Sequence, residues 1–300
     1  MSAYATCRSW YFVEGANRQA LEQAAMSGAD VLVQELEDFT PPEQRPTAHA
    51  LAAGIYAAWR AAGAIAGVRI NPLGQGGRAD LAGVMPARPD FVALPKVAGP
   101  GDIVALDRAV AAAEADLGIA PGRTRLVPNI ESAAALVQAG AIARASPRVA
   151  ALMLASEDMA ADLGAERLPD CAELAYVRQR FLVECRAVGV PAVDCPYTWS
   201  DRQGLRADAL WARRMGFQAK SVVARAHAAV VNAVFTPDAA AIAHARRLIA
   251  AFEAARARGE ARATLDGALI EMPAVTAARR LLARAGALGE KAVSPPGENR

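Results

Sequence analysis

Two carboxylates, Glu131 and Asp158, stand at equivalent places in successive segments of the sequence. The segment RTRLVPNIESAAALVQ, residues 123–138, contains an apolar run that ends at Glu131 and continues into an alanine-rich helical pattern. The segment VAALMLASEDMAADLG, residues 149–164, has the same design, with Glu157 and Asp158 after its apolar run. Two neighbouring carboxylates repel each other unless a proton or a cation lies between them. Mg²⁺ favours such hard oxygen ligands and takes one or two carboxylates together with water.

Each of these carboxylates also fits a second interpretation. A carboxylate at the start of a helix accepts hydrogen bonds from backbone N–H groups that have no partner within the helix. For either residue alone, this structural role is the better interpretation. Because Glu131 and Asp158 occupy matching positions in consecutive units, we favour a shared metal site and expect Mg²⁺ as its ion.

The elements that would position these residues alternate between strand-like apolar runs and helical patterns. The runs are continuously apolar, as in parallel strands that are buried on both faces. Eight such runs predict an α/β fold of the (β/α)₈ TIM barrel type, with the carboxyl ends of all strands at one mouth. An open, doubly wound sheet fits the alternation too, but no GxGxxG follows an early strand. The expected strands are residues 10–13, 31–36, 67–70, 91–95, 126–130, 149–154, 192–195 and 220–224.

The chain is longer than one barrel requires. We expect the barrel over residues 1–236, a C-terminal helical extension over 237–290 and a disordered tail over 291–300. The extension contains two helical patterns, 239–258 and 275–287, with ATLDGALIEMP as a loop between them. The apolar faces of these helices must be buried, which favours packing of the extension at a subunit interface.

Composition argues against several kinds of partner. The formal net charge is +2 and no long basic run occurs, so we expect no nucleic acid partner. Alanine inflates the hydrophobic content of 54%, and we expect no membrane-spanning run and no signal peptide. The four cysteines lack CxxC spacing, as is typical of reduced thiols, which favours a cytoplasmic protein. The chain has only three histidines, and this small number argues against a zinc site with histidine ligands.

Nine short segments carry a resemblance to a known family. In chain order they are LEDFTPPEQR, VRINPL, the loop ending in ADL, ALPKV, VPNIES, SEDMAADLG, AVDCPY, MGFQAK and DGALIEMP. This order, from about Trp10 to Leu282, resembles the citrate lyase β-subunit-like branch of the HpcH/HpaI aldolase superfamily. The resemblance implies a Mg²⁺-dependent barrel that makes or breaks a carbon–carbon bond next to a carbonyl. It also implies acyl-CoA thioesters such as citryl-, malyl- or citramalyl-CoA as substrates, and homotrimers or hexamers.

The same motifs imply roles for individual residues. By position, Glu131 and Asp158 match the family's metal ligands, with Glu131 also beside the substrate. Arg69 matches the arginine that holds the substrate carboxylate, as a guanidinium does with two parallel hydrogen bonds. Its alternative role is an ion pair across the barrel mouth, for example with Glu37. Glu37 and Asp38 match a pair near the metal-bound waters and are catalytic candidates.

Three departures from the family pattern stand out. Glu14 occupies the usual place of proline, since FVPGNRP is FVEGANR here, and the IHP segment expected after Lys220 is replaced by SVVARAH. Both regions belong to the acyl-carrier pocket of relatives. Glu271 replaces the aspartate of the MID segment, a residue that enters a neighbour's active site as an acid or base. It is the third catalytic candidate.

Two further charged residues follow expected strands. For Lys96 we consider two roles: it neutralises the charge of the site, or it forms a Schiff base with the substrate. The carboxylate pair argues against a Schiff base, so we expect an electrostatic or structural role. Asp194 is expected to be structural or to support a ligand rather than to bind the metal.

We predict a Mg²⁺-dependent carbon–carbon lyase of the retro-aldol or Claisen type. It would act on a hydroxyacyl-CoA through a metal-stabilised enolate. One alternative is a CoA-independent class II aldolase that cleaves a 4-hydroxy-2-oxo acid to pyruvate, favoured by the missing IHP segment and opposed by the lack of a histidine base. Another is a malyl-CoA thioesterase. A non-catalytic relative is the last, and the intact Glu131, Asp158 and Arg69 argue against it.

Overall fold

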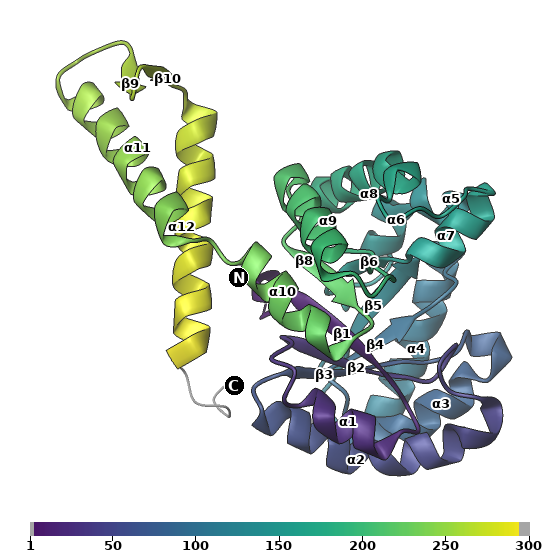
Figure 1. Cartoon of the computed structure of the whole chain (residues 1–300). Coiled ribbons are helices and arrows are strands. Elements are labelled where there is room, and N and C mark those ends of the chain that lie inside the picture. Colours follow the sequence, from purple (N-terminus) through teal and green to yellow (C-terminus); the bar gives the residue numbers. More distant parts are fainter. Residues whose placement is uncertain (1–2, 294–300) are drawn as a thin grey trace. The chain divides into compact units, whose positions relative to one another are not determined.

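The computed structural model describes residues 3–293, and in that range eight parallel strands close into a barrel (Figure 1). Each strand pairs with the next along the chain, and β1 pairs with β8 to close the sheet. The predicted (β/α)₈ TIM barrel with additional C-terminal helices is confirmed. The barrel strands are β1 (Ser9–Glu14), β2 (Val31–Glu35), β3 (Ile65–Arg69), β4 (Phe91–Leu94), β5 (Arg125–Ile130), β6 (Leu152–Leu154), β7 (Ala192–Asp194) and β8 (Ala219–Val222).

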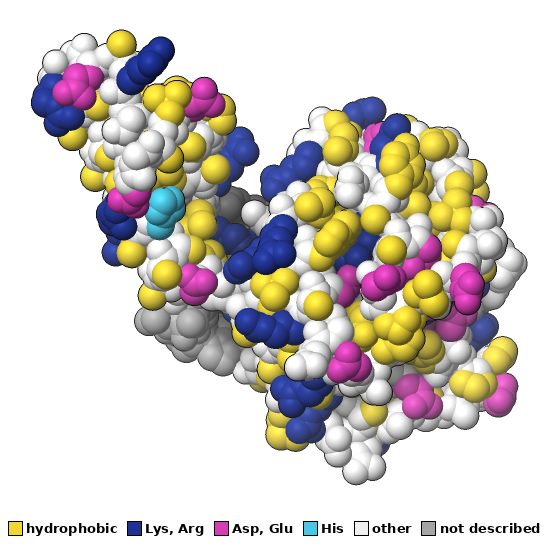
Figure 2. Space-filling model, turned by 45° about the horizontal axis from the view of Figure 1, so that its top comes forward, with side chains coloured by type: hydrophobic (Ala, Val, Ile, Leu, Met, Phe, Trp, Pro, Cys, Tyr) yellow, Lys and Arg dark blue, Asp and Glu magenta, His cyan; other side chains and the backbone are white. Residues whose placement is uncertain are grey.

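Helices follow the strands and surround the barrel (Figure 1). Side-chain caps begin several of them: Asn17 accepts the N–H of Ala20 at 3.0 Å, and Ser132 accepts that of Ala135 at 3.2 Å. The helices are α1 (Arg18–Ala24), α2 (Arg45–Ala61), α3 (Gly77–Val84), α4 (Pro100–Asp116), α5 (Ala133–Leu136), α6 (Ala139–Arg144), α7 (Ser156–Leu163), α8 (Ala175–Val188), α9 (Arg202–Met215) and α10 (Arg225–Phe235). Basic and acidic side chains are interspersed over the visible surface, in line with the small net charge (Figure 2).

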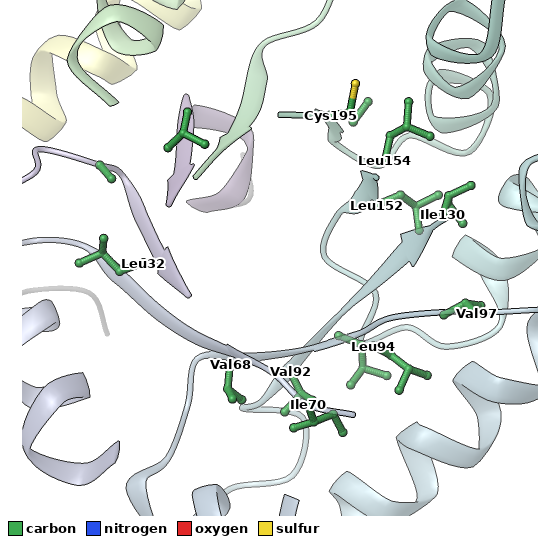
Figure 3. Close-up of a cluster of buried hydrophobic side chains, with 14 of the residues drawn as sticks. Leu32, Val68, Ile70, Val92, Leu94, Val97, Ile130, Leu152, Leu154 and Cys195 are labelled. Atoms are coloured by element: carbon green, nitrogen blue, oxygen red, sulfur yellow. The ribbon is translucent and has the colours of Figure 1, made fainter. Parts of the chain in front are cut away.

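The strands bury both of their faces, and each face packs in a different part of the core. Outward side chains such as Leu32, Val68 and Leu152 pack in the layer between the strands and the helices (Figure 3). Inward side chains such as Val33 and Val127 fill the barrel itself. Successive residues of a strand point to opposite faces. The inward alternation therefore continues to Glu35, Arg69 and Glu131 at the carboxyl ends of β2, β3 and β5.

Aromatic side chains fill the amino-terminal end of the barrel. The rings of Trp10 and Phe91 lie 5.3 Å apart, and Tyr4 contacts both. Phe91 can occupy the interior because β3 carries Gly67 beside it, where a Cβ atom would lie 2.1 Å from the ring. The interior is thus closed by packing at one end, and the inward polar residues gather at the other.

Within the described range, residues 236–293 form a second compact unit. Its elements are α11 (Ala239–Ala257), β9 (Ala263–Leu265), β10 (Ala268–Ile270) and α12 (Met272–Val293), and its apolar core includes Phe252, Ile270 and Val275. The segment expected as a loop is an antiparallel hairpin, because Asp266 and Gly267 adopt the positive φ angles that a tight two-residue turn requires. Helix α12 also includes residues 291–293, which we expected in the tail, and residues 294–300 lie outside the described range.

One helical stretch, Arg225–Ala257, meets a length and composition test for a membrane span, with a mean hydropathy of 1.2 over its most apolar window. The expectation that no run is long enough was therefore wrong by this test. The stretch is divided at Pro237 into α10 and α11, and α10 packs against β1 and β8.

Candidate active site at the barrel mouth

A cavity of about 350 Å³ lies at the carboxyl ends of β4, β5 and β6. Both Glu131, directly after β5, and Asp158, in the first turn of α7, line it, so the structure brings the two carboxylates to one cavity. Lys96 and Ser132 line it as well. Asp162, from the last turn of α7, accepts the N–H of Ala133 at 2.7 Å and thereby fixes the wall that follows Glu131.

Glu131 is buried and incompletely paired. Its Oε2 accepts the N–H of Lys96 at 3.0 Å, and Lys96 reaches this position with a φ of 52°, which is uncommon for a residue other than glycine. Its Oε1 is buried without a hydrogen-bond partner among the described residues. Burial raises the pKa of Glu131 to about 7; Arg69 opposes the rise, and Asp158 and Glu37 add to it. A proton or a cation at Oε1 would relieve this state.

The residues present fit Mg²⁺. This ion typically binds one or two carboxylates and fills its remaining positions with water or substrate. Glu131 and Asp158 supply such a pair in one cavity, and the unpaired Oε1 of Glu131 is a ready ligand atom. Within the described residues, no cluster of three or more His, Cys, Asp or Glu side chains is arranged to hold a metal. An ion here would therefore depend on this pair and on oxygen atoms from water or a ligand.

Arg69, at the end of β3, lies among three carboxylates. Its Nε is 3.0 Å from Oε1 of Glu35 and 3.4 Å from Oε2 of Glu37, and its Nη2 is 3.5 Å from Asp38. The guanidinium also lies 5.2 Å from the centre of the Phe12 ring. Burial alone would lower the pKa of Arg69, but the neighbouring carboxylates raise it above its ordinary value. The ion pair with Glu37 that the sequence suggested is present, but Glu35 is the nearer partner.

Lys96 contacts both acidic groups of the mouth: its backbone N–H donates to Glu131, and its side chain reaches Glu37. Its Nζ lies 2.5 Å from Oε1 of Glu37 and 3.8 Å from Asp38. The contact with Glu37 raises the pKa of Lys96, so the amine is protonated and is not a Schiff-base nucleophile. Burial raises the pKa of Glu37, although Arg69 and Lys96 oppose the rise. The structure therefore favours the electrostatic role expected for Lys96.

Two polar residues of the site were missed by sequence reasoning. Glu35 is fully buried on β2, and Asn129 lies one inward position before Glu131 with its Oδ1 buried and without a partner in the described part of the chain. Both lie inside apolar runs that we took only as strands. The available signal was the period of two, which gives Glu35 the inward direction of Val31 and Val33.

The remaining candidates lie away from this cavity or on the second unit. Asp194 is buried against Arg178 and Lys220, at 2.6 and 2.8 Å, and Arg178 also pairs with Asp208. This group joins β7 and β8 to α8 and α9, which agrees with the structural role expected for Asp194. Glu271 lies exposed between β10 and α12 of the second unit.

Comparison with known proteins agrees with the fold. The model of the HpcH/HpaI aldolase/citrate lyase family matches residues 8–225, which include all eight barrel strands. The citrate lyase subunit beta of Escherichia coli (strain K12) is 32% identical over 287 residues, covering 93% of each chain. A (3S)-malyl-CoA thioesterase of Cereibacter sphaeroides is 33% identical over 283 residues, covering 94% of this chain and 95% of the relative.

A solved structure is similar over nearly the whole chain. The CitE protein of Mycobacterium tuberculosis, in complex with magnesium, acetoacetate and coenzyme A, superposes with a TM-score of 0.73 and 27% identity. The match covers 93% of this chain and 98% of that one. The chain therefore belongs to the HpcH/HpaI aldolase/citrate lyase family, whose similar members include a lyase subunit and a thioesterase.

Proposed function

We propose that this chain is a Mg²⁺-dependent carbon–carbon lyase that cleaves a hydroxyacyl-CoA such as citryl-, malyl- or citramalyl-CoA. The observation that carries the proposal is the buried, unpaired oxygen of Glu131 in a cavity that it shares with Asp158. Arg69 lies close enough to Glu131 for that carboxylate to raise the pKa of Arg69. Similarity to a citrate lyase subunit and to a structure with magnesium and coenzyme A supports the reaction class.

Glu131 and Asp158 would hold the ion. When bound, Mg²⁺ supplies positive charge beside the carbonyl oxygen on which negative charge develops as the bond breaks. Arg69 binds the substrate carboxylate and fixes the distance of the reacting carbon from the ion's ligands. Glu131 itself borders the bound substrate, because it lines the cavity next to Lys96.

Cleavage of a hydroxyacyl-CoA requires loss of the hydroxyl proton and, after the carbon–carbon bond breaks, protonation of the acyl carbon. Glu37 is suited to the first step, since its buried carboxyl has a raised pKa and accepts a proton readily. Asp38 is half exposed at the same turn and orients water beside it. Glu271 is the proposed acid for the second step.

The chain works as a homotrimer or hexamer in this proposal, and Glu271 reaches the site of a neighbouring subunit. The helices of the second unit have an apolar core of their own, which makes the hairpin next to Glu271 a defined support for it. We also propose a cytoplasmic location, in which the four buried cysteines remain free thiols.

A thioesterase is the second candidate, because the similarity to the malyl-CoA thioesterase is as strong as that to the citrate lyase subunit. The same site would then direct water to the thioester carbonyl. The CoA-independent aldolase stays an alternative because SVVARAH replaces the IHP segment.

One assay separates these functions. The protein is incubated with Mg²⁺ and each of citryl-, malyl- and citramalyl-CoA, and free thiol and keto acid are measured in parallel. A lyase releases a carbonyl product and keeps the thioester, whereas a thioesterase releases free CoA thiol without a carbonyl product. Asp158→Asn is the control that should abolish either signal. If no CoA thioester is consumed but a 4-hydroxy-2-oxo acid is cleaved to pyruvate, the proposed CoA substrate class is wrong.

A further inference from the structure

Glu35 is a fully buried carboxylate at the barrel mouth, and it takes no part in the reaction proposed for this site. It is the last residue of β2, and the parallel register of β2 and β3 places it directly opposite Arg69. Both residues continue the inward alternation of their strands. The pairing therefore follows from strand register and not from a flexible surface contact.

The Glu35 carboxylate accepts three hydrogen bonds. Its Oε1 accepts from Nε of Arg69 at 3.0 Å and from the N–H of Glu37 at 2.6 Å. Its Oε2 accepts from the N–H of Phe39 at 2.6 Å. One side chain thus holds both the substrate-binding arginine and the turn that carries Glu37 and Asp38.

The backbone of Glu35 is fixed as well. Its carbonyl oxygen accepts the hydroxyl of Thr40 at 2.5 Å, and that hydroxyl accepts the N–H of Gly15 at 2.9 Å. A Cβ atom at Gly15 would lie 2.4 Å from the same carbonyl oxygen. The turn of residues 36–40 is therefore closed against β1, and the Glu35 side chain has a rigid base.

We propose that Glu35 is the positioning residue of this site, in a role that rests on the function proposed above. It holds Arg69 by the Nε edge, so that a ligand carboxylate would approach the terminal nitrogens: Nη1, and Nη2 beside Asp38 at 3.5 Å. Phe12 fixes the plane of the guanidinium from one side, at 5.2 Å. An arginine oriented in advance loses less conformational entropy on binding, so a keto acid binds more tightly.

The first test measures the affinity for pyruvate in the presence of Mg²⁺ by calorimetry. Glu35→Gln removes the charge and cannot accept hydrogen bonds at both atoms, so the dissociation constant for pyruvate rises roughly tenfold or more. Mg²⁺ affinity stays near that of the wild type, since Glu131 and Asp158 are unchanged. In turnover, KM rises more than kcat falls.

Asp30→Asn is the matched control. Asp30 is a buried carboxylate at the opposite end of β2, where it accepts from Nε of Arg8 at 2.8 Å. Both variants neutralise a buried carboxylate that pairs with an arginine, and only Glu35→Gln weakens pyruvate binding. Equal weakening in Asp30→Asn would show a general loss of structure and overturn the proposal.

A double-mutant cycle tests whether Glu35 acts through Arg69. If it does, the Glu35→Gln/Arg69→Lys protein binds pyruvate no more weakly than Arg69→Lys alone. Effects that multiply would overturn the positioning role, as would an unchanged affinity in Glu35→Gln. A wild-type protein that binds none of pyruvate, oxaloacetate and glyoxylate with Mg²⁺ overturns the proposed function, and this inference with it; whichever of the three binds most tightly replaces pyruvate in the tests of Glu35. Wild-type binding with an indifferent Glu35→Gln overturns the inference alone.

Discussion

Replacing Glu131 by glutamine should stabilise the protein at alkaline pH when metal is removed. In the folded chain, the pKa of Glu131 is raised from 4.5 to about 7, mainly by burial. The folded state therefore binds the proton more tightly than the unfolded state does. As pH rises from 4.5 to 7, the unfolded state ionises first, so stability falls across this window and stays lowered above it.

The size of the effect follows from the pKa. A change from 4.5 to about 7 corresponds to about 3 kcal/mol at pH 8, since each pH unit is worth about 1.4 kcal/mol. Glutamine does not ionise, so Glu131→Gln removes this cost. For a chain of this size the melting temperature should rise by roughly 5–10 °C. At pH 4.5 and below the two proteins should melt alike.

The assay is thermal unfolding at pH 5, 6, 7 and 8, in EDTA or in excess Mg²⁺. Mg²⁺ should raise the melting temperature of the wild type most at pH 8 and leave Glu131→Gln unchanged, because a ligand that binds only the folded state stabilises it. Glu114→Gln is the control of opposite sign. Burial alone would raise the pKa of Glu114, but hydrogen bonds from Arg148 and backbone N–H groups lower it, so its stabilisation is present above pH 4.5 and is lost in acid. Equal stability of Glu131→Gln and wild type at pH 8 in EDTA would refute the reasoning.

Three further predictions concern ligand binding and activity. Arg69→Lys should weaken pyruvate binding by about 1.5–3 kcal/mol with little change in Mg²⁺ affinity, and an unchanged dissociation constant in calorimetry would make Arg69 structural. Lys96→Met should move the acidic limb of the kcat profile to higher pH, because Lys96 opposes the rise in the pKa of Glu37; a fixed profile would exclude Glu37 as the base. Inactive Glu271→Ala and Asp158→Asn subunits, mixed under exchange, should recover activity in shared sites, and mixed oligomers that stay inactive would exclude the action of Glu271 across subunits.

The sequence was sufficient for the barrel because the signal is local and repeated. Each strand is an apolar run, and the parallel arrangement places every strand end at one mouth. Glu131 and Asp158 could therefore be expected at one cavity before the structure was known. The hairpin at Asp266–Gly267 had a local signal too, since Asp-Gly favours a two-residue turn, but helical patterns on both sides led us to expect a loop.

The inward direction of Glu35 follows from the period of two, but its pairing with Arg69 could not be found in this way, because that pairing depends on strand register. Within the sequence Glu35 is one of three acidic residues in QELED, and the other two carry the family likeness. Only the pairing of β2 with β3 sets Glu35 against Arg69. Register is a contact between distant parts of the chain, and a shift by one residue would turn Glu35 outward.

The charges at the barrel mouth support the cation that we propose for this site. Five carboxylates share it with two basic side chains; they are Glu35, Glu37, Asp38, Glu131 and Asp158 against Arg69 and Lys96. If all were ionised, three negative charges would lack compensation in a largely buried site. Arg69 and Lys96 both lie nearest to the Glu35–Asp38 turn, so the deficit falls on the other side. That side holds Glu131, whose pKa is raised to about 7 and whose Oε1 lacks a partner among the described residues. One divalent ion would offset most of the deficit there. The same arrangement is therefore the reason for the predicted pH dependence, for the predicted effect of Mg²⁺ on stability and for the proposal of Glu131 and Asp158 as ligands.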